Sequence, residues 1–243
     1  MRVLMVGGAG YVAGLVMPIL VAEHSVRVFD LRPPPDVTLD HVVGNVADRD
    51  ALLRAAEGCD ALLYMAMGDK RFALTESIIT NFDVSVRGLY LALDAANAAG
   101  IGHAVYTSSM SVYEGDLLER RFDDEAIAPD ADHFYGLSKR LGEEICRSAV
   151  RAHGMSINVL RLCFPLADAD WQAQVRPGEV MLATAATDLA RALLAALTYR
   201  DGFQAFTISG DHAECVMGMS KARRLLGWAP LARPQEAGDV ATL

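Results

Sequence analysis

The stretch Arg2–Gly14, which reads RVLMVGGAGYVAG, decides the fold of this chain. Its apolar run Val3–Val6 is too short for a helix and too apolar for an exposed edge, so we expect a buried parallel strand there. A glycine-rich turn follows at once, and we expect an apolar helix over residues 11–22. A strand, a glycine turn and a helix in this order indicate a dinucleotide-binding unit.

The glycines and the start of the helix have separate roles in such a unit. Gly7 permits the tight turn, and Gly10 lets the backbone approach a pyrophosphate without a side chain in the way. The helix begins with Tyr11 and Val12, and this end offers unpaired N–H groups to that anion. Ala13 is small enough for the helix to pack close to the strand. Because glycine turns also follow strands for steric reasons alone, the motif needs support from the rest of the chain.

The following strands extend the predicted cofactor site. The run VRVFD ends at Asp30, about twenty residues past the turn, where a carboxylate can accept hydrogen bonds from the ribose hydroxyls of adenosine. This acid favours NAD because it would repel a 2′-phosphate, although Arg32 could soften the preference. We expect Asn45, at the end of the third strand, to face the adenine ring. Val46 beside it, and Ala66 after the fourth strand, complete the predicted cofactor-binding set.

The gross composition excludes several classes of protein. The chain has 243 residues, 22% of them charged and 52% apolar, which indicates a globular protein with one sizeable core. A net charge of −9 argues against nucleic acid or an anionic membrane as the main partner. Mean hydropathy is +0.22, yet no apolar run of about eighteen residues predicts a membrane-spanning helix.

The cysteines and the N-terminus indicate a compartment. The first strand begins after one arginine, which leaves no room for a signal peptide. The four cysteines are scattered without a C-x-x-C pair, and the six histidines are dispersed. We therefore expect a reduced, cytoplasmic protein without a metal site.

Apolar runs and helical segments alternate along the rest of the chain. Further strands are expected over residues 41–45, 61–66, 104–108, 158–161 and 205–208, with helices between them. This alternation predicts an α/β fold with a doubly wound parallel sheet, the Rossmann fold.

The predicted domains follow from where the alternation is interrupted. Residues 165–186 leave room only for a loop and a short helix, so the substrate cap near the C-terminus is small. We assign residues 1–164 and 187–209 to the NAD-binding Rossmann domain, and residues 165–186 and 210–243 to the cap.

Three segments resemble the extended short-chain dehydrogenase/reductases, the family of NAD-dependent epimerases and dehydratases. Residues 107–113, TSSMSVY, resemble the family's T-S-S-x-x-V-Y-G segment, and residues 135–139, YGLSK, match its Y-x-x-x-K. Residues 220–230, SKARRLLGWAP, resemble its S-K-A-x-x-L-L-G-W-x-P. The resemblance covers nearly the whole chain and implies an NAD-dependent enzyme. Among these enzymes the chain looks most like uronate dehydrogenase. The features that carry this likeness are its compact length, Gly88-Leu89-Tyr90 and Asp94-Ala95-Ala96.

A tyrosine and a lysine carry the chemistry that this resemblance implies. Tyr135 and Lys139 are four residues apart and so share one helix face. A free phenol has a pKa of about 10, and a nearby ammonium lowers that pKa, which makes proton transfer practical. The resemblance implies Tyr135 as the acid/base, Lys139 as the residue that binds the nicotinamide ribose and tunes Tyr135, and Ser109 as the residue that orients the substrate. The alternative is an amphipathic helix with a half-buried tyrosine and a solvated lysine.

Departures from the family pattern affect the substrate side. The family's Asn in N-V-x-G is Ser85 here, and Asn81, one helical turn earlier, is a candidate to replace it. Where the family often reads R-Y-F-N-P, residues 161–165 read RLCFP, so Phe164 replaces a polar substrate contact. Ser111 is a further candidate for contact with the substrate, or it satisfies the loop backbone.

Arg176 is the one basic residue between Pro165 and Thr187. A single guanidinium fits one carboxylate better than it fits a diphosphate with a base. We therefore expect a small anionic substrate such as a free uronic acid, with Arg176 as the carboxylate anchor. A solvated loop arginine is the alternative.

These observations predict an NAD-dependent oxidoreductase that transfers a hydride between a sugar or sugar-acid carbinol and nicotinamide, similar to uronate dehydrogenase. An NAD-dependent nucleotide-sugar 4-epimerase is one alternative, and a non-catalytic NAD-binding regulatory protein on the same scaffold is another. We also expect a homodimer that pairs through the helices near residues 71–99 and 135–151. The candidate apolar contacts are Leu89, Leu93, Leu141 and Ile145.

Overall fold

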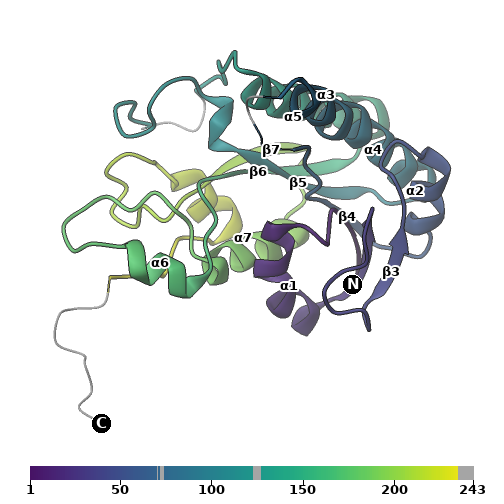
Figure 1. Cartoon of the computed structure of the whole chain (residues 1–243), viewed down its shortest axis with the longest axis horizontal. Helices are drawn as coiled ribbons and strands as arrows, with labels where there is room; N and C mark the ends of the chain where they lie inside the picture. The colour runs from purple at the N-terminus through teal and green to yellow at the C-terminus, as the bar shows by residue number, and fades with distance from the viewer. Residues whose placement is uncertain (70, 72–73, 123–126, 235–243) are drawn as a thin grey trace, which may run out of the picture.

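The computed structural model describes residues 1–69, 71, 74–122 and 127–234. In this part of the chain, parallel strands form one sheet in the order β3-β2-β1-β4-β5-β6-β7 (Figure 1). The order reverses between β1 and β4, as the predicted doubly wound parallel sheet requires. The strands are β1 (Arg2–Val6), β2 (Ser25–Asp30), β3 (Asp40–Val43), β4 (Ala61–Tyr64), β5 (His103–Ser109), β6 (Ser156–Leu162) and β7 (Phe203–Ile208).

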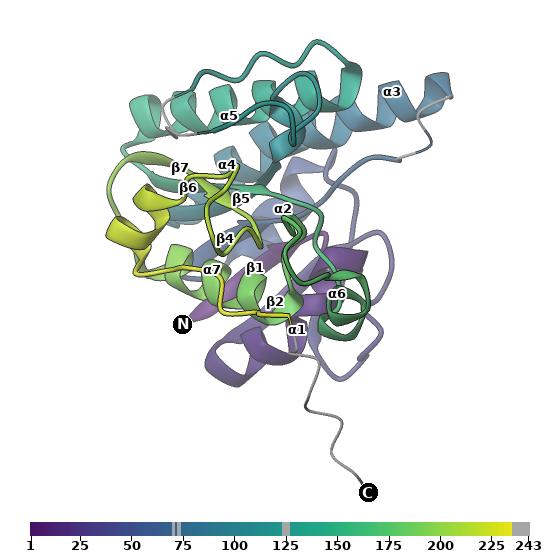
Figure 2. The ribbon, with the colours of Figure 1, turned by 90° about the vertical axis from the view of Figure 1, so that its left-hand side faces the viewer.

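Helices cover both faces of this sheet (Figure 2). One face carries α1 (Tyr11–Glu23) and α7 (Ala186–Thr198), and the other carries α2 (Arg49–Ala56), α4 (Leu89–Ala98) and α5 (Phe134–His153). The remaining helical elements are α3 (Thr75–Phe82), η1 (Asp83–Gly88), η2 (Met110–Val112), α6 (Asp168–Gln174) and η3 (Ala222–Leu226). None of the described helices has the length and apolar character needed to cross a membrane.

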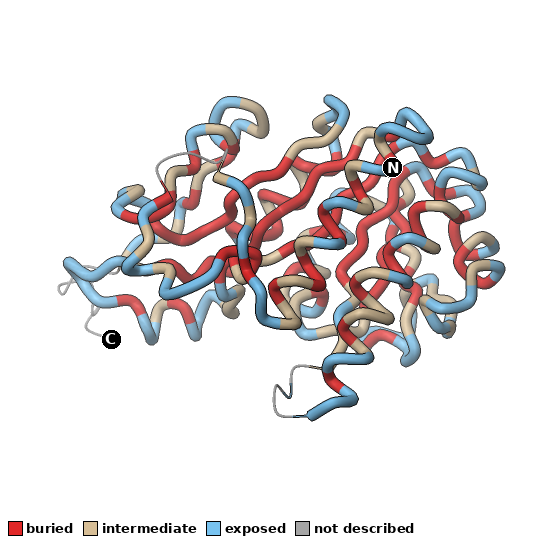
Figure 3. The backbone as a smooth tube through the Cα atoms, turned by 90° about the horizontal axis from the view of Figure 1, so that it is seen from above, coloured by how far each residue is buried: buried red, intermediate tan, exposed pale blue. Residues whose placement is uncertain are grey.

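Strand β1 shows why the opening run is apolar throughout. Val3 and Met5 belong to the core on the α1 and α7 face, whereas Leu4 and Val6 belong to the core on the opposite face. Successive strand residues point to opposite faces, so a central strand covered on both sides needs apolar residues at every position. The buried backbone of the sheet runs through the middle of the molecule (Figure 3).

The helical region before Gly100 contains a π-helical interruption, η1, that the sequence pattern did not predict. The Tyr64 hydroxyl donates a hydrogen bond to the carbonyl of Val84 at 2.6 Å, and the amide of Leu89 donates to the same carbonyl. A Cβ at Gly88 would lie 2.6 Å from a methyl of Val46 and 2.8 Å from that hydroxyl. The Tyr64 hydroxyl therefore bonds to the helix backbone at the π-helical interruption. Glycine at position 88 leaves the room that Val46 and Tyr64 need there.

The two predicted cap segments share a small core. Val216 and Met217 join Cys163 and Leu182 in a small core beside Tyr113. This core also includes Met110, Val112 and Phe122, so the segment after β5 contributes to the cap as well.

The tail that follows returns to the Rossmann core. Ala222 and Trp228 are buried against α1 and α7, and the Trp228 indole N–H donates to the carbonyl of Asp188 at 2.9 Å. The Asp188 carboxylate accepts the amides of Leu231 and Ala232, each at 2.9 Å. The assignment of residues 210–243 to the cap is therefore wrong for this stretch, and residues 235–243 lie outside the described residues.

Candidate active site

A cleft of about 1040 Å³ lies over the carboxyl ends of the central strands. It sits where the strand order reverses, which is the place that an open α/β sheet offers to a ligand. The structure brings together thirteen of the fourteen predicted site residues in its lining. These are Gly7, Gly10, Tyr11, Val12, Asp30, Asn45, Val46, Ala66, Ser109, Ser111, Tyr135, Lys139 and Phe164.

The glycine turn brings strand, helix and cleft together. Gly7 has φ of +89°, and a Cβ there would lie 2.4 Å from the backbone nitrogen of Ala66. Gly10 begins α1 without a side-chain cap, so the first N–H groups of the helix, at Tyr11 and Val12, are open to the cleft. A Cβ would fill this cradle, and uncapped N–H groups at a helix N-terminus suit a pyrophosphate. The turn therefore fits a dinucleotide.

The adenosine end of the cleft is organised around Asp30. One oxygen of its carboxylate accepts the amide of Ala9 at 3.0 Å, and the other accepts the amide of Arg32 at 3.2 Å. The remaining lone pairs face the cleft, where ribose hydroxyls could donate to them. The Asn45 side-chain oxygen instead accepts the amide of Ala47 at 2.9 Å, so this residue shapes the loop at the cleft wall.

Ser109 and Tyr135 meet at the other end. Their side chains share a hydrogen bond, and Ser109 Oγ also accepts the amide of Ser111 at 3.1 Å. Strand β5 ends at Ser109, and α5 presents Tyr135 from its first turn. A Cβ at Gly136 would lie 2.2 Å from the carbonyl of Ser111, so glycine is what allows α5 to approach this closely.

The pKa of Tyr135 differs from the expectation. Burial raises the pKa of the phenol, and the hydrogen bond with Ser109 opposes that rise only in part. Lys139 is buried, and its ammonium donates to the carbonyl of Thr107 at 2.9 Å. In this structure burial therefore has the larger effect on the pKa of Tyr135, and the lowering of that pKa by Lys139 stays a prediction.

The structure also contains a buried ion pair beside Ser108, which the sequence analysis did not predict. Arg161 on β6 donates to both carboxylate oxygens of Glu143 on α5, at 2.9 and 2.7 Å. Glu143 also accepts the hydroxyl of Ser108, and Arg161 donates to the hydroxyl of Tyr113 at 2.6 Å. This network ties α5 to the ends of β5 and β6. The sequence contained one indication that Glu143 lies near the site. Glu143 follows Lys139 by four residues and therefore shares its helix face.

Two expected contacts are not made. The Asn81 amide donates to the carbonyls of Asp69 and Ser77, both at 2.7 Å, so it braces a loop instead of replacing the family's asparagine. Arg176 lies outside the cleft lining, and its guanidinium donates to the carbonyls of Ala173 and Val175 at the end of α6. In this structure Arg176 therefore lies away from the cleft, engaged by backbone carbonyls, and its role as a carboxylate anchor stays a prediction.

The fold and cleft define a dinucleotide-binding protein of the Rossmann type with a serine, a tyrosine and a lysine at one end. The chain belongs to the NAD dependent epimerase/dehydratase family, whose model matches residues 3–169. NAD is the cofactor of this family, and the glycine turn and Asp30 of the cleft fit it.

Two curated relatives and one solved structure show the range of similar proteins. The chain is 29% identical over 172 residues to L-arabinose 1-dehydrogenase (NAD(P)(+)) of Haloferax volcanii, a match that covers 66% of each chain. It is 37% identical over 123 residues to 3 beta-hydroxysteroid dehydrogenase/Delta 5-->4-isomerase of Mycobacterium tuberculosis, over 47% of this chain and 33% of that one. The match thus spans less than two thirds of either relative. A mutated uronate dehydrogenase has the same fold, with a TM-score of 0.76, 21% identity, and coverage of 95% of this chain and 82% of that one.

Proposed function

We propose that this protein is an NAD-dependent oxidoreductase that interconverts a carbinol and a carbonyl group. The observation that carries the proposal is the hydrogen bond between Ser109 and Tyr135, at the end of a cleft whose other end fits a dinucleotide. A non-catalytic NAD-binding protein needs no proton donor at this place.

The chain's own residues divide the work along the cleft. The amides of Tyr11 and Val12 hold the pyrophosphate, and Asp30 accepts the adenosine ribose hydroxyls. Ser109 holds the substrate oxygen, and Tyr135 exchanges the hydroxyl proton with that oxygen. NAD⁺ held in the cleft would supply the hydride acceptor, so that carbinol and NAD⁺ would give carbonyl compound, NADH and one proton. Lys139 lies one helical turn after Tyr135 and donates to the carbonyl of Thr107.

The relatives favour sugars as one substrate class, since L-arabinose and uronate dehydrogenases are among them. With Arg176 away from the cleft, the proposal includes no carboxylate anchor. A 4-epimerase would use the same first step and return the hydride to the same carbon. The two outcomes differ in product, because only net oxidation leaves NADH.

The test is NADH formation by purified protein with NAD and a panel of L-arabinose, D-galacturonate, UDP-glucose and apolar secondary alcohols. NADH formed with any substrate supports net oxidation. An epimeric sugar without NADH supports the epimerase. Neither product, while calorimetry shows bound NAD, contradicts the proposal and favours a regulatory protein.

We also propose a homodimer, with an interface that differs in part from the one expected from the sequence. Leu89 and Leu93 are buried in the core and cannot form an interface. Leu141 is exposed on α5, and α3 and α4 add exposed apolar side chains on the same side of the sheet. These are Ile78, Ile79 and Tyr90. Sedimentation as a dimer at micromolar concentration, and as a monomer after Ile79→Glu, is the expected result. A monomeric wild-type protein contradicts it.

A further inference from the structure

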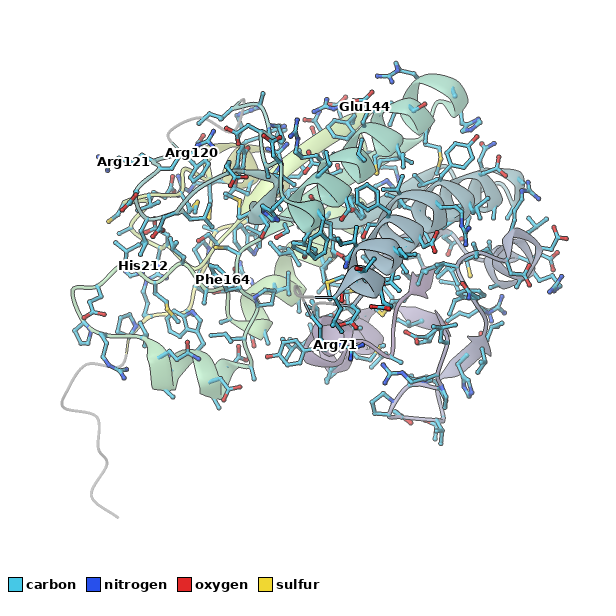
Figure 4. The ribbon with its side chains drawn as sticks, turned by 45° about the horizontal axis from the view of Figure 1, so that its top comes forward. Arg71, Arg120, Arg121, Glu144, Phe164 and His212 are labelled. Carbon is cyan, nitrogen blue, oxygen red and sulfur yellow. The ribbon has the colours of Figure 1, made fainter. Side chains whose placement is uncertain are left out.

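Phe164 has a backbone conformation that a phenylalanine rarely adopts. Its φ is +38°, in the left-handed region that favours glycine and asparagine. The residue lies on the loop after β6 (Figure 4), and it lines the cleft together with Ser109 and Tyr135. A bulky residue persists in such a conformation only where its surroundings hold it there.

The hydrogen bonds on both sides hold this residue. Cys163 donates its amide to the carbonyl of Ile208 at 3.0 Å, and its carbonyl accepts both the amide and the hydroxyl of Thr184, at 3.0 and 2.9 Å. On the other side, the amide of Leu166 donates to the carbonyl of Thr184 at 3.0 Å. Thr184 is fully buried. These bonds therefore fix the backbone position from which the Phe164 side chain projects, and the residue is 63% exposed in the cleft wall.

The surface around this ring is apolar or acidic. A second hollow adjoins the cleft at Phe164, and its lining includes the acidic residues Glu114 and Asp116. Each carboxylate accepts one backbone amide, of Asp132 and of Leu118, and keeps its negative charge at this hollow. Among the described residues, His133 is the one basic side chain that lines this second hollow. In the main cleft, Lys139 donates to the carbonyl of Thr107, and Arg87 pairs with Asp83 at 3.5 Å. Several apolar residues line the cleft, the second hollow or both, as Phe164 does. They include Met110, Leu117, Leu118, Leu162, Cys163, Pro165 and Leu182.

The nearest arginines on the cap are already engaged. Arg120 pairs with Asp130 at 2.7 Å, and Arg121 donates to the carbonyl of Cys215, on a loop separate from Phe164 (Figure 4). A carboxylate or diphosphate in this hollow would therefore meet carboxylates without a bidentate partner. An apolar group would instead bury itself against an aromatic ring.

We infer that Phe164 is a specificity residue for uncharged secondary alcohols, and the corresponding ketones, that carry an apolar ring beside the carbinol carbon. This inference rests on the proposed function. The substrate hydroxyl lies at Ser109 and Tyr135, and its ring packs on Phe164 and Leu117. The negative lining at Glu114 and Asp116 disfavours sugar acids and nucleotide sugars.

The test compares Phe164→Asn with the wild-type protein. Asparagine accepts the left-handed backbone, so we expect the variant to fold with a melting temperature equal to or above that of the wild type, measured without NAD. Removal of the ring should raise KM for 1-phenylethanol and 1-cyclohexylethanol roughly 10- to 100-fold, with kcat changed much less. Leu231→Asn is the matched control, because Leu231 is 62% exposed and lies outside both hollows.

Three results would overturn the inference. One is turnover of L-arabinose or D-galacturonate, but of neither apolar alcohol, by the wild type, which leaves the proposed function intact. Another is an equal KM for the apolar alcohols in Phe164→Asn and Leu231→Asn. Failure of every alcohol while NAD is bound would instead contradict the proposed function itself, and the inference with it.

Discussion

The adenosine end and the substrate end of the cleft are built from different materials. At the first, backbone groups and short side chains that directly follow β1, β2, β3 and β4 shape the wall, as the close approach of Gly7 to Ala66 and the bonds of Asp30 show. At the second, side chains far apart in the sequence meet, among them Leu117, Tyr135 and Phe164.

This difference explains what each end can vary. The first end must match one cofactor, and a Cβ at Gly7 would collide with backbone, so little can change there. The second end is a set of loop side chains around a fixed proton donor, so new side chains can alter the substrate without altering the chemistry.

The largest expected effect separates the two ends by function. Tyr135→Phe removes the proton donor and leaves the glycine turn untouched, so turnover should fall by roughly 10²–10⁴. The Kd for NAD, measured by calorimetry, should stay within a few-fold of the wild type. A variant with wild-type turnover would remove Tyr135 from the mechanism and with it the distinction between the ends.

The next prediction concerns the pH dependence of the free energy of unfolding, through His103 on β5 of the sheet. Burial lowers the pKa of His103 to about 4, and nearby Arg200 adds to that effect. The unfolded histidine has a pKa of about 6.5. Because the unfolded state binds the proton first, the free energy of unfolding is complete above pH 6.5 and should fall by about 3 kcal/mol as pH drops to 4.

Denaturant titrations at several pH values between 4 and 7 test this expectation. His103→Gln should lose the histidine-dependent part of the slope in that range. Identical slopes for wild type and variant would mean that other groups dominate the pH dependence of stability.

The smallest expected effect concerns cofactor choice at the adenosine end. Asp30→Ala removes a carboxylate that would repel a 2′-phosphate, so the preference for NAD over NADP should shrink by roughly tenfold. The ratio of the two Kd values, from calorimetry on wild type and variant, measures this. Equal wild-type affinity for both cofactors would show that Arg32 outweighs Asp30.

The comparison of the two ends also explains how far sequence could predict the site. The glycine turn, Asp30 and the spacing of Tyr135 and Lys139 are local patterns, so their backbone consequences can be read from one stretch. The pairing of Glu143 with Arg161 joins a helix to a strand eighteen residues on, and it depends on how the two pack.

The predicted contacts and the structure differ where the direction of a side chain decides which partner it meets. Arg176 is in the expected segment, but its guanidinium turns to the carbonyls that end α6. Lys139 is on the expected helix face, but its ammonium binds Thr107 and burial sets the pKa of Tyr135. Helical spacing places a residue on a face without fixing the partner that it chooses there.

The most direct test of the proposed chemistry is isotope transfer. Alcohols of both classes, 1-phenylethanol and D-galacturonate, would carry deuterium on the carbinol carbon and be incubated with the protein and NAD. The account predicts deuterium at C4 of the nicotinamide of the product NADH with the wild type and at least one of these two alcohols, and a rate lower by roughly 10²–10⁴ with Tyr135→Phe. Unlabelled nicotinamide with every alcohol, while NAD remains bound, would contradict it.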